Sequence, residues 1–310
     1  MTTSLVTGGG GFIGSHLVDA LLARGDEVRV LDNFSTGKLE NLQPNIENIR
    51  LFTGDLRDSM ILNEAVQGVD LIFHQAAFVS VPQSMEDPES CFDINVNGTG
   101  KLLAAAKAAG VKRVVLASSA AVYGENEAMP LSENEEPDPL SPYAASKSIN
   151  EVYARLFTEQ LGLDVVALRY FNVYGPRQNP ASDYAAVIPI FIKTLDEEET
   201  PVIFGDGLQT RDFVYISDVV QANLLAAESV KAPGLVFNIC SGKEINLLDL
   251  LENLSTIYNR KIEPDFREVR AGDIYRSLGD PGKAREILGF APITSIVDGL
   301  DETAAWMRGS

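Results

Sequence analysis

Short runs of apolar and β-branched residues alternate with amphipathic stretches up to about residue 170 of the chain. The runs read SLVT, VRVLD, IRLFTGD, LIFHQAA, RVVLASS and VVALRYF, and helical patterns lie between them. This alternation predicts an α/β fold with a doubly wound parallel sheet, and the nearly continuous apolar runs fit strands that are covered on both faces. Right-handed crossovers then bring the C-terminal ends of the strands to one edge, where we expect ligands to bind.

The pattern loosens after about residue 175, where prolines punctuate shorter strands and helices. We therefore predict a Rossmann-like domain over residues 1–174 and a smaller, mixed α/β substrate-binding lobe over most of residues 175–310. The chain is expected to re-enter the first domain near residues 205–242. The helical pattern from Ser217 to Val230 and the run LVFNIC are typical of ordinary sheet elements.

A glycine-rich turn, TGGGGFIG, follows the first predicted strand. Gly8 permits the turn, Gly11 lets a pyrophosphate approach the backbone, and Gly14 allows close packing of the next helix. That helix is expected to run from Phe12 and Ile13 to Arg24, and its N-terminal N–H groups attract anions. The turn therefore predicts a site for the pyrophosphate of a dinucleotide.

Asp32 ends the second predicted strand, eighteen residues after Gly14. A carboxylate at this point accepts hydrogen bonds from the adenosine ribose and repels a 2′-phosphate, which favours NAD over NADP. A turn residue that starts the following loop is the alternative reading of Asp32. The other candidate cofactor residues follow this and the next strands. They are Asn33, Asp55 and Leu56, the last two beside the adenine, and Asn95 on a later helix.

Tyr143 and Lys147 are four residues apart in SPYAASKSINEVYARLF, so they share one face of a predicted helix. The ammonium group of Lys147 is expected to lower the pKa of the Tyr143 phenol and make it a base. Either motif alone, the glycine-rich turn or this pair, is weak. Their occurrence in one strand–helix pattern indicates a redox cofactor held beside a base.

Charge and composition exclude several classes of partner. Forty-four acidic and twenty-five basic residues give a formal net charge of −19, which disfavours nucleic acid and anionic membranes. No apolar run approaches the roughly 20 residues of a membrane span, and no leader pattern opens the chain, so we expect a cytoplasmic protein. The two cysteines, Cys91 and Cys240, and the two histidines lack metal-ligand spacing, so we expect no metal site.

Ten motifs in a fixed order resemble the extended short-chain dehydrogenase/reductase superfamily, and within it the NAD-dependent epimerases of the UDP-glucose 4-epimerase type. They are TGGGGFIGSHLVDALL, LDNFSTG, GDLRD, FHQAA, NVNGT, SSAAVYG, SPYAASK, LRYFNVYGPRQ, GDGLQTRDFVYISDV and RAGD. The resemblance implies that Tyr143 takes a proton from the sugar 4-hydroxyl while C4 transfers hydride to NAD. The 4-keto sugar then turns over, and hydride returns to its other face. Ser119 would bridge tyrosine and substrate, and Lys147 would hold the nicotinamide ribose.

The resemblance also implies the residues that bind the UDP-sugar. The members are Arg211, Arg270 and Asn172 at the diphosphate, Asp273 near the uridine ribose, and Arg177 as a further ligand. Ser277 falls where a small side chain leaves room beside C2 of the sugar. We therefore expect UDP-glucose and UDP-galactose as substrates together with their N-acetylated forms, UDP-GlcNAc and UDP-GalNAc.

Three alternatives stay open. A UDP-glucuronate 4-epimerase or another nucleotide-sugar reductase of the same superfamily would keep the fold and the Tyr143–Lys147 pair. A non-catalytic dinucleotide-binding protein is disfavoured because Ser119 is present as well. The related dehydratases carry an acidic pair where this chain has Ala120 and Ala121. The resemblance finally implies a homodimer through helices near residues 88–110 and 142–162.

Overall fold

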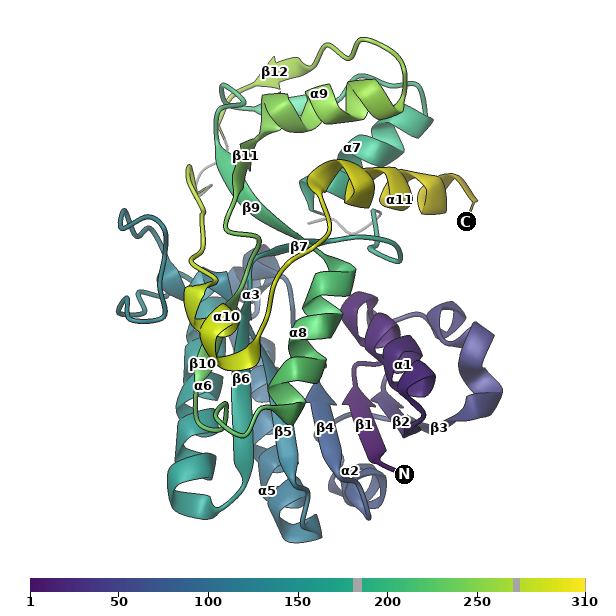
Figure 1. Ribbon diagram of the computed structural model, residues 1–310, viewed down its shortest axis with the longest axis vertical. Coiled ribbons are helices and arrows are strands. Elements are labelled where there is room, and N and C mark those ends of the chain that lie inside the picture. The colour runs from purple at the N-terminus through teal and green to yellow at the C-terminus, as the bar shows by residue number, and fades with distance from the viewer. Residues whose placement is uncertain (181–185, 270–273, 310) are drawn as a thin grey trace.

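Seven parallel strands form the larger sheet of the computed structural model, which describes residues 1–180, 186–269 and 274–309 (Figure 1). The strand order is β10-β6-β5-β4-β1-β2-β3. Their bounds are β1 Thr3–Thr7, β2 Glu27–Asp32, β3 Ile49–Thr53, β4 Leu71–His74, β5 Arg113–Ser119, β6 Asp164–Tyr170 and β10 Val236–Ile239. The order reverses at β1, so the neighbouring C-terminal ends of β1 and β4 form the crevice where such sheets bind ligands.

Helices cover both faces of this sheet, and a separate apolar core lies between the sheet and the helices on each face. One core contains side chains of α1 (Phe12–Arg24), α8 (Ile216–Glu228) and α10 (Gly282–Leu288). The other contains side chains of α2 (Ser59–Val66), α5 (Thr99–Ala109) and α6 (Pro142–Leu161). The predicted α/β fold with a doubly wound parallel sheet is therefore confirmed.

Two smaller sheets and three helices make up the other part of the molecule, at the top of Figure 1. The three-stranded sheet has the order β11-β9-β7, and the two-stranded sheet pairs β12 with β8. Their bounds are β7 Asn172–Tyr174, β8 Val202–Phe204, β9 Thr210–Tyr215, β11 Glu244–Asn246 and β12 Asp265–Arg267. A third core, which includes Phe191, Leu250 and Leu300, lies between these strands and the helices α7 (Val187–Asp196), α9 (Leu247–Ile257) and α11 (Ile296–Gly309).

The chain passes between the two parts more than once. Within residues 205–242, β9 lies in a smaller sheet, whereas α8 packs on α1 and β10 pairs with β6. The substrate-binding role and the boundary at residue 174 remain predictions. Among the described residues, no helix is long and apolar enough to cross a membrane.

Short helical turns lie in the connections that follow β2, β4 and β5. Their bounds are η1 Leu39–Asn41, η2 Gln43–Asn48, α3 Val81–Glu86, α4 Pro88–Phe92, η3 Asp93–Gly98 and η4 Ala120–Tyr123. The segment η3 is a π-helical turn that leads into α5. Wider turns of this kind are frequent at functional sites, and this one carries Asn95.

Candidate active site

The glycine-rich turn joins β1 to α1 at the ligand edge. Gly8 has φ 69°, a left-handed conformation that favours glycine, and its carbonyl accepts a hydrogen bond of 3.1 Å from the Gly11 nitrogen. A Cβ atom added to Gly8 would lie 2.6 Å from the Ala76 nitrogen. Backbone without side chains thus forms a cradle at the N-terminus of α1, and this cradle fits a dinucleotide pyrophosphate.

The Asp32 carboxylate closes the next part of this edge. It is buried at the end of β2, where one oxygen accepts from the Gly10 nitrogen at 2.8 Å and the other accepts from the Phe34 nitrogen at 2.7 Å. The second contact is the turn role that was the alternative reading. Each oxygen keeps a further lone pair, so the same carboxylate is able to accept ribose hydroxyls.

The start of α6 carries Tyr143 and Lys147 to the C-terminal end of β5. Ser141 caps the helix by accepting a 3.1 Å hydrogen bond from the Ala144 nitrogen, and Pro142 occupies the first turn. The Lys147 Nζ atom donates to the Ala117 carbonyl at 2.9 Å and lies 5.7 Å from the centre of the Tyr143 ring. The structure therefore brings these two side chains together, next to the strand that ends in Ser119.

Ser119 makes two contacts. It hydrogen-bonds the Tyr143 phenol, and its Oγ also accepts from the Ala121 nitrogen at 3.2 Å. The serine therefore both starts the following turn and reaches the tyrosine hydroxyl. All three residues that we predicted as catalytic converge at one point.

The electrostatics of this triad differ from our expectation. Burial raises the pKa of the Tyr143 phenol, and only the hydrogen bond with Ser119 opposes that rise. Burial also lowers the pKa of Lys147 to about 8. The expectation that Lys147 lowers the pKa of Tyr143 is wrong for this structure. Removal of the phenolate from water is the dominant effect on the pKa of Tyr143.

Asn95 and His74 are buried and form hydrogen bonds with residues around the site. Asn95 is buried; its Oδ1 accepts from the Phe78 nitrogen at 2.7 Å, and its Nδ2 donates to Ser146 Oγ at 2.9 Å. It thus ties the loop after β4 to the helix that carries Lys147. His74 lies between the hydroxyls of Thr7 and Thr99, at 2.7 and 2.9 Å, and burial lowers the pKa of this imidazole to about 3. A neutral imidazole that bridges two threonines is structural.

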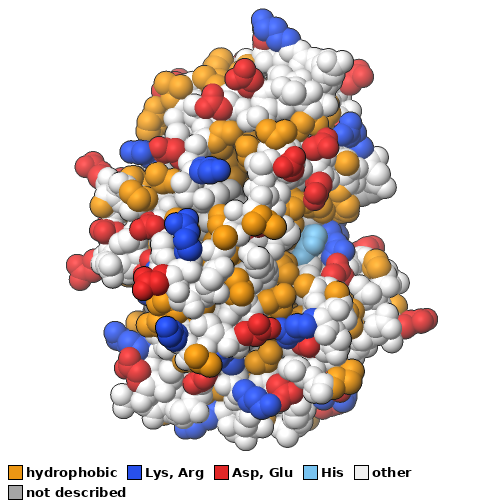
Figure 2. Space-filling view, viewed as in Figure 1, with side chains coloured by type: hydrophobic (Ala, Val, Ile, Leu, Met, Phe, Trp, Pro, Cys, Tyr) orange, Lys and Arg blue, Asp and Glu red, His pale blue; other side chains and the backbone are white. Residues whose placement is uncertain are grey.

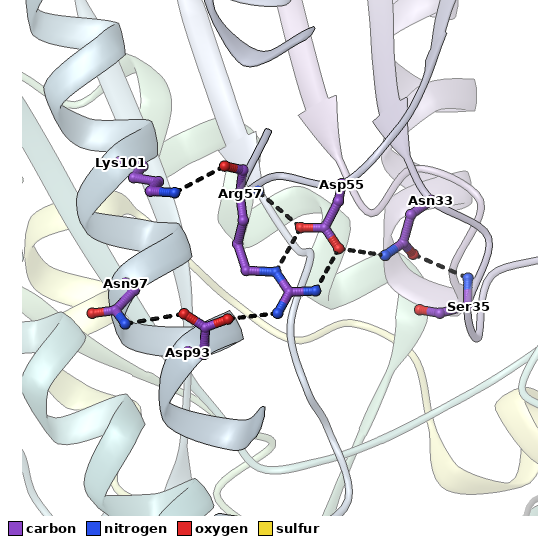
Figure 3. Close-up of polar contacts among 7 residues, drawn as sticks. All are labelled: Asn33, Ser35, Asp55, Arg57, Asp93, Asn97 and Lys101. Atoms are coloured by element: carbon purple, nitrogen blue, oxygen red, sulfur yellow. Dashed lines mark hydrogen bonds and ion pairs between the residues drawn. The ribbon is translucent and has the colours of Figure 1, made fainter. Parts of the chain in front are cut away.

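The loops after β2 and β3 meet at a cluster of charged side chains (Figure 3). Asn33 Nδ2 donates to the Asp55 carboxylate at 3.1 Å, and Arg57 forms an ion pair with the same carboxylate at 2.8 Å. This pair holds the pKa of Asp55 well below its usual range. Leu56 is buried in the core beneath the cluster. Sequence analysis proposed Asp55 but missed Arg57, which only the contact itself identifies.

A cavity of about 490 Å³ lies in the smaller part of the molecule. Asn172 and Arg211, both predicted substrate ligands, line it from β7 and β9. Further lining residues that sequence analysis missed are Val187, Val202, Phe204, Gln209 and Arg267. The run TPVIFGDG, which contains two of them, offered no recognisable signal by itself.

The remaining predicted ligands take other positions. Arg177 forms an ion pair with Asp19 on α1 at 2.6 Å and does not line the cavity. The Ser277 nitrogen donates to the Thr210 carbonyl at 3.2 Å, so Ser277 lies beside the start of β9, the strand that also carries Arg211. Arg270 and Asp273 lie outside the described residues. Within the described ranges, no group of three or more acidic, cysteine or histidine side chains is arranged to hold a metal ion.

Known proteins match nearly the whole chain. A family described as NAD dependent epimerase/dehydratase matches residues 4–240. UDP-glucose 4-epimerase of Mycolicibacterium smegmatis is 40% identical over 309 residues, covering 98% of each chain. The solved UDP-N-acetylglucosamine 4-epimerase of Methanobrevibacter ruminantium, in complex with UDP-N-acetylmuramic acid, has a TM-score of 0.95 and 44% identity, covering 99% of this chain and 98% of that one.

A second solved structure is nearly as similar to this chain. The UDP-glucose 4-epimerase of Thermotoga maritima, with UDP-glucose, has a TM-score of 0.94 and 39% identity and covers 99% of each chain. The resemblance that we drew from ten motifs is confirmed. The chain belongs to the NAD-dependent epimerase/dehydratase family, as an NAD-dependent enzyme of the UDP-sugar 4-epimerase type.

Proposed function

We propose that this enzyme interconverts the C4 epimers of UDP-hexoses, namely UDP-glucose with UDP-galactose and UDP-GlcNAc with UDP-GalNAc. The observation that carries the proposal is the convergence of Ser119, Tyr143 and Lys147 at one strand end beside the glycine-rich cradle. Ala120 and Ala121 follow Ser119, so the first turn after the strand carries no carboxylic acid to expel a neighbouring hydroxyl. Inversion at C4 needs only a reversible base and a hydride acceptor.

NAD fits the ligand edge on the features already described. The cradle at Gly8 and Gly11 would hold its pyrophosphate, and Asp32 its adenosine ribose. Lys147 would hold the nicotinamide ribose. Bound NAD supplies the hydride acceptor and a positive ring beside the phenol.

Tyr143 acts as the reversible base. The phenolate oxygen takes the proton from the 4-hydroxyl as the C4–H bond breaks, and it returns that proton once the new C4–H bond forms on the opposite face. Ser119 hydrogen-bonds the same oxygen and orients it. Because burial raises the pKa of the Tyr143 phenol, formation of the phenolate needs a further positive charge, which a bound oxidised nicotinamide would supply.

The cavity in the smaller part of the molecule is proposed to bind the UDP group. Arg211 and Asn172 would donate to the diphosphate, which needs such donors because the chain is strongly acidic. The apolar walls formed by Val202 and Phe204 suit a flat pyrimidine ring. Arg270 and Asp273 keep their predicted roles at the diphosphate and the uridine ribose.

N-acetylated sugars are included because of Ser277. A small side chain next to Arg211 leaves room for an acetamido group at C2, whereas Ala120 and Ala121 offer that group no hydroxyl. The room therefore permits the larger sugars without a dedicated polar contact. We expect both classes of substrate to be epimerised at comparable rates.

The assembly and location of the enzyme also remain proposals. We propose a homodimer through the helices of residues 88–110 and 142–162. Two apolar side chains of α6 support this, since Val152 and Leu156 are 53% and 42% exposed. The cytoplasmic location and the division into domains at residue 174 are proposed on the sequence pattern alone.

The function is tested by incubating the enzyme with UDP-glucose, UDP-GlcNAc and UDP-glucuronate without added reductant. The C4 epimers are then separated and quantified. We expect galacto products from the first two substrates and none from UDP-glucuronate. Turnover of UDP-glucuronate alone, or net oxidation without an epimer, would contradict the proposal.

A further inference from the structure

Arg57 lies at the centre of the charged cluster in Figure 3. Its Nε and Nη2 atoms both donate to the Asp55 carboxylate at 2.8 Å, and its Nη1 atom donates to Asp93 at 2.6 Å. The guanidinium group thus joins the loop after β3 to the π-helical turn η3. Such a forked contact fixes the plane of a carboxylate as well as its distance.

The surroundings of Arg57 hold it in place. Asn97 Nδ2 donates to Asp93 at 3.1 Å, and Lys101 Nζ donates to the backbone carbonyl of Arg57 at 2.9 Å. The side chains of Asp55, Arg57 and Asp93 are still 32%, 35% and 45% exposed. Ion pairs with this exposure contribute little to stability, about 0–1 kcal/mol each. The cluster is therefore better explained by orientation of the Asp55 carboxylate than by a contribution to stability.

The adenine of NAD is expected against this cluster, and this step rests on the proposed cofactor site. Asp32 would hold the adenosine ribose at the end of β2, and the next residue, Asn33, donates a hydrogen bond to Asp55 in the loop after the neighbouring strand β3. A base attached to that ribose therefore meets the loop after β3.

The acceptor sites of Asp55 are filled. One oxygen accepts from the Arg57 nitrogen and Nε, and the other accepts from Arg57 Nη2 and from Asn33 Nδ2. A carboxylate offers about four lone-pair sites, so a new donor has to replace one of these. The contact from Asn33 is the longest of the four, at 3.1 Å, and the only one from a neutral side chain. It is the one that an incoming amine would replace.

We propose that Arg57 is a positioning residue for the cofactor. It orients the Asp55 carboxylate so that the oxygen bonded to Asn33 accepts the exocyclic amine of the adenine. Arg57 does not contact the cofactor itself. Its effect is selectivity for an amine on the base, and binding of the base releases Asn33 toward the ribose.

The test compares NAD with nicotinamide hypoxanthine dinucleotide, in which a carbonyl oxygen replaces the adenine amine. Dissociation constants are measured by calorimetry on the full-length chain freed of nucleotide. We expect the unmodified chain to prefer NAD by about tenfold, the scale of a hydrogen bond to a charged group. In Arg57→Met this ratio falls to about one. Arg57→Lys, which cannot fork to both carboxylates, gives an intermediate ratio.

Arg50→Met is the matched control, because Arg50 forms an exposed ion pair with Glu64 at 2.8 Å at the opposite end of β3. It should keep the full ratio. If the stripped variants do not stay folded, exchange of bound NAD for an equal mixture of both nucleotides, read by mass analysis, gives the same ratio.

Each other outcome overturns the inference. Equal weakening of both dinucleotides in Arg57→Met would show a merely structural role. If Asp55→Ala abolishes the tenfold preference for NAD and Arg57→Met keeps it, Arg57 is not a positioning residue. The placement of the adenine beside Asp55 would then still hold. No selectivity in the unmodified chain would reject the placement too, whereas C4 epimerisation is judged separately with the panel of UDP-sugars.

Discussion

The catalytic edge of the large sheet and the cavity of the smaller part differ in how they hold their side chains. At the edge, Lys147 is 4% exposed and donates a hydrogen bond to a backbone carbonyl. Its neighbours Tyr143 and Ser119 are hydrogen-bonded to each other. At the cavity, Arg211 and Arg267 come from two separate small sheets, and Arg267 is exposed. The residues that we propose for chemistry thus lie where the backbone fixes side chains, and those that we propose for recognition lie where separate segments meet.

This difference sets how each region should respond to substitution. A buried group that handles a proton affects the chemical step, whereas a cation on the cavity wall affects binding of the ground state as much as the transition state. The expected signatures are a fall in kcat for the edge and a rise in KM for the cavity. Four measurements test this contrast.

Tyr143→Phe should have the largest effect. It removes the base and keeps the ring, so kcat is expected to fall by about 10²-fold or more with little change in KM. Steady-state kinetics with UDP-glucose measures both. Tyr153→Phe on the same helix is the control, because its ring packs on Phe157 away from the triad. Retention of most activity in Tyr143→Phe would rule out the proposed base.

Arg211→Met should act on the cavity. Loss of a charge-assisted donor to the diphosphate is expected to raise KM by about tenfold or more, with a smaller change in kcat. Arg260→Met is the control, since Arg260 lies in the same part of the molecule but bonds the Leu195 carbonyl. A pure fall in kcat would mean that the two regions are not separable in this way.

Ser277→Tyr should separate the two classes of sugar. A bulky ring beside Arg211 is expected to lower kcat/KM for UDP-GlcNAc by about tenfold while UDP-glucose, the internal reference, changes less. Equal losses for the two substrates would remove Ser277 as the determinant of size. Absence of activity on UDP-GlcNAc in the unmodified enzyme would do so as well.

The smallest effect concerns Lys147 and pH. Its pKa is about 8 in the folded chain and near the ordinary 10.5 when unfolded, so the unfolded state binds more protons between these values. The free energy of unfolding should therefore rise with pH across this window, by about 1 kcal/mol from pH 8 to 9, relative to Lys147→Met. Urea unfolding of both proteins measures it.

Lys112→Met, which removes a mostly exposed lysine, is the control for the pH series and should keep the same rise with pH as the unmodified chain. A parallel pH dependence for the unmodified chain and Lys147→Met would contradict the burial of an ammonium group at the edge. The charged groups of the edge and those of the cavity would then not differ in burial.

Much of the catalytic edge was predictable because its signals are local in the chain. The glycine-rich turn, the four-residue spacing of Tyr143 and Lys147, and the alternation of strands and helices each depend on neighbouring residues. Turn chemistry and periodicity act over a few positions, so residue order was enough to predict the fold class, the cofactor and the three residues that meet at the end of β5.

Other features depend on burial and on partners that are distant in the chain, so they appear only in the folded molecule. Burial reversed the expected direction of the Tyr143 pKa, and a partner on α1 took Arg177 away from the cavity. The cavity walls and the clamp of Arg57 on Asp55 join segments that no short pattern relates. Desolvation and pairing arise only when the folded chain sets the distances, which is why these features could not be inferred from residue order.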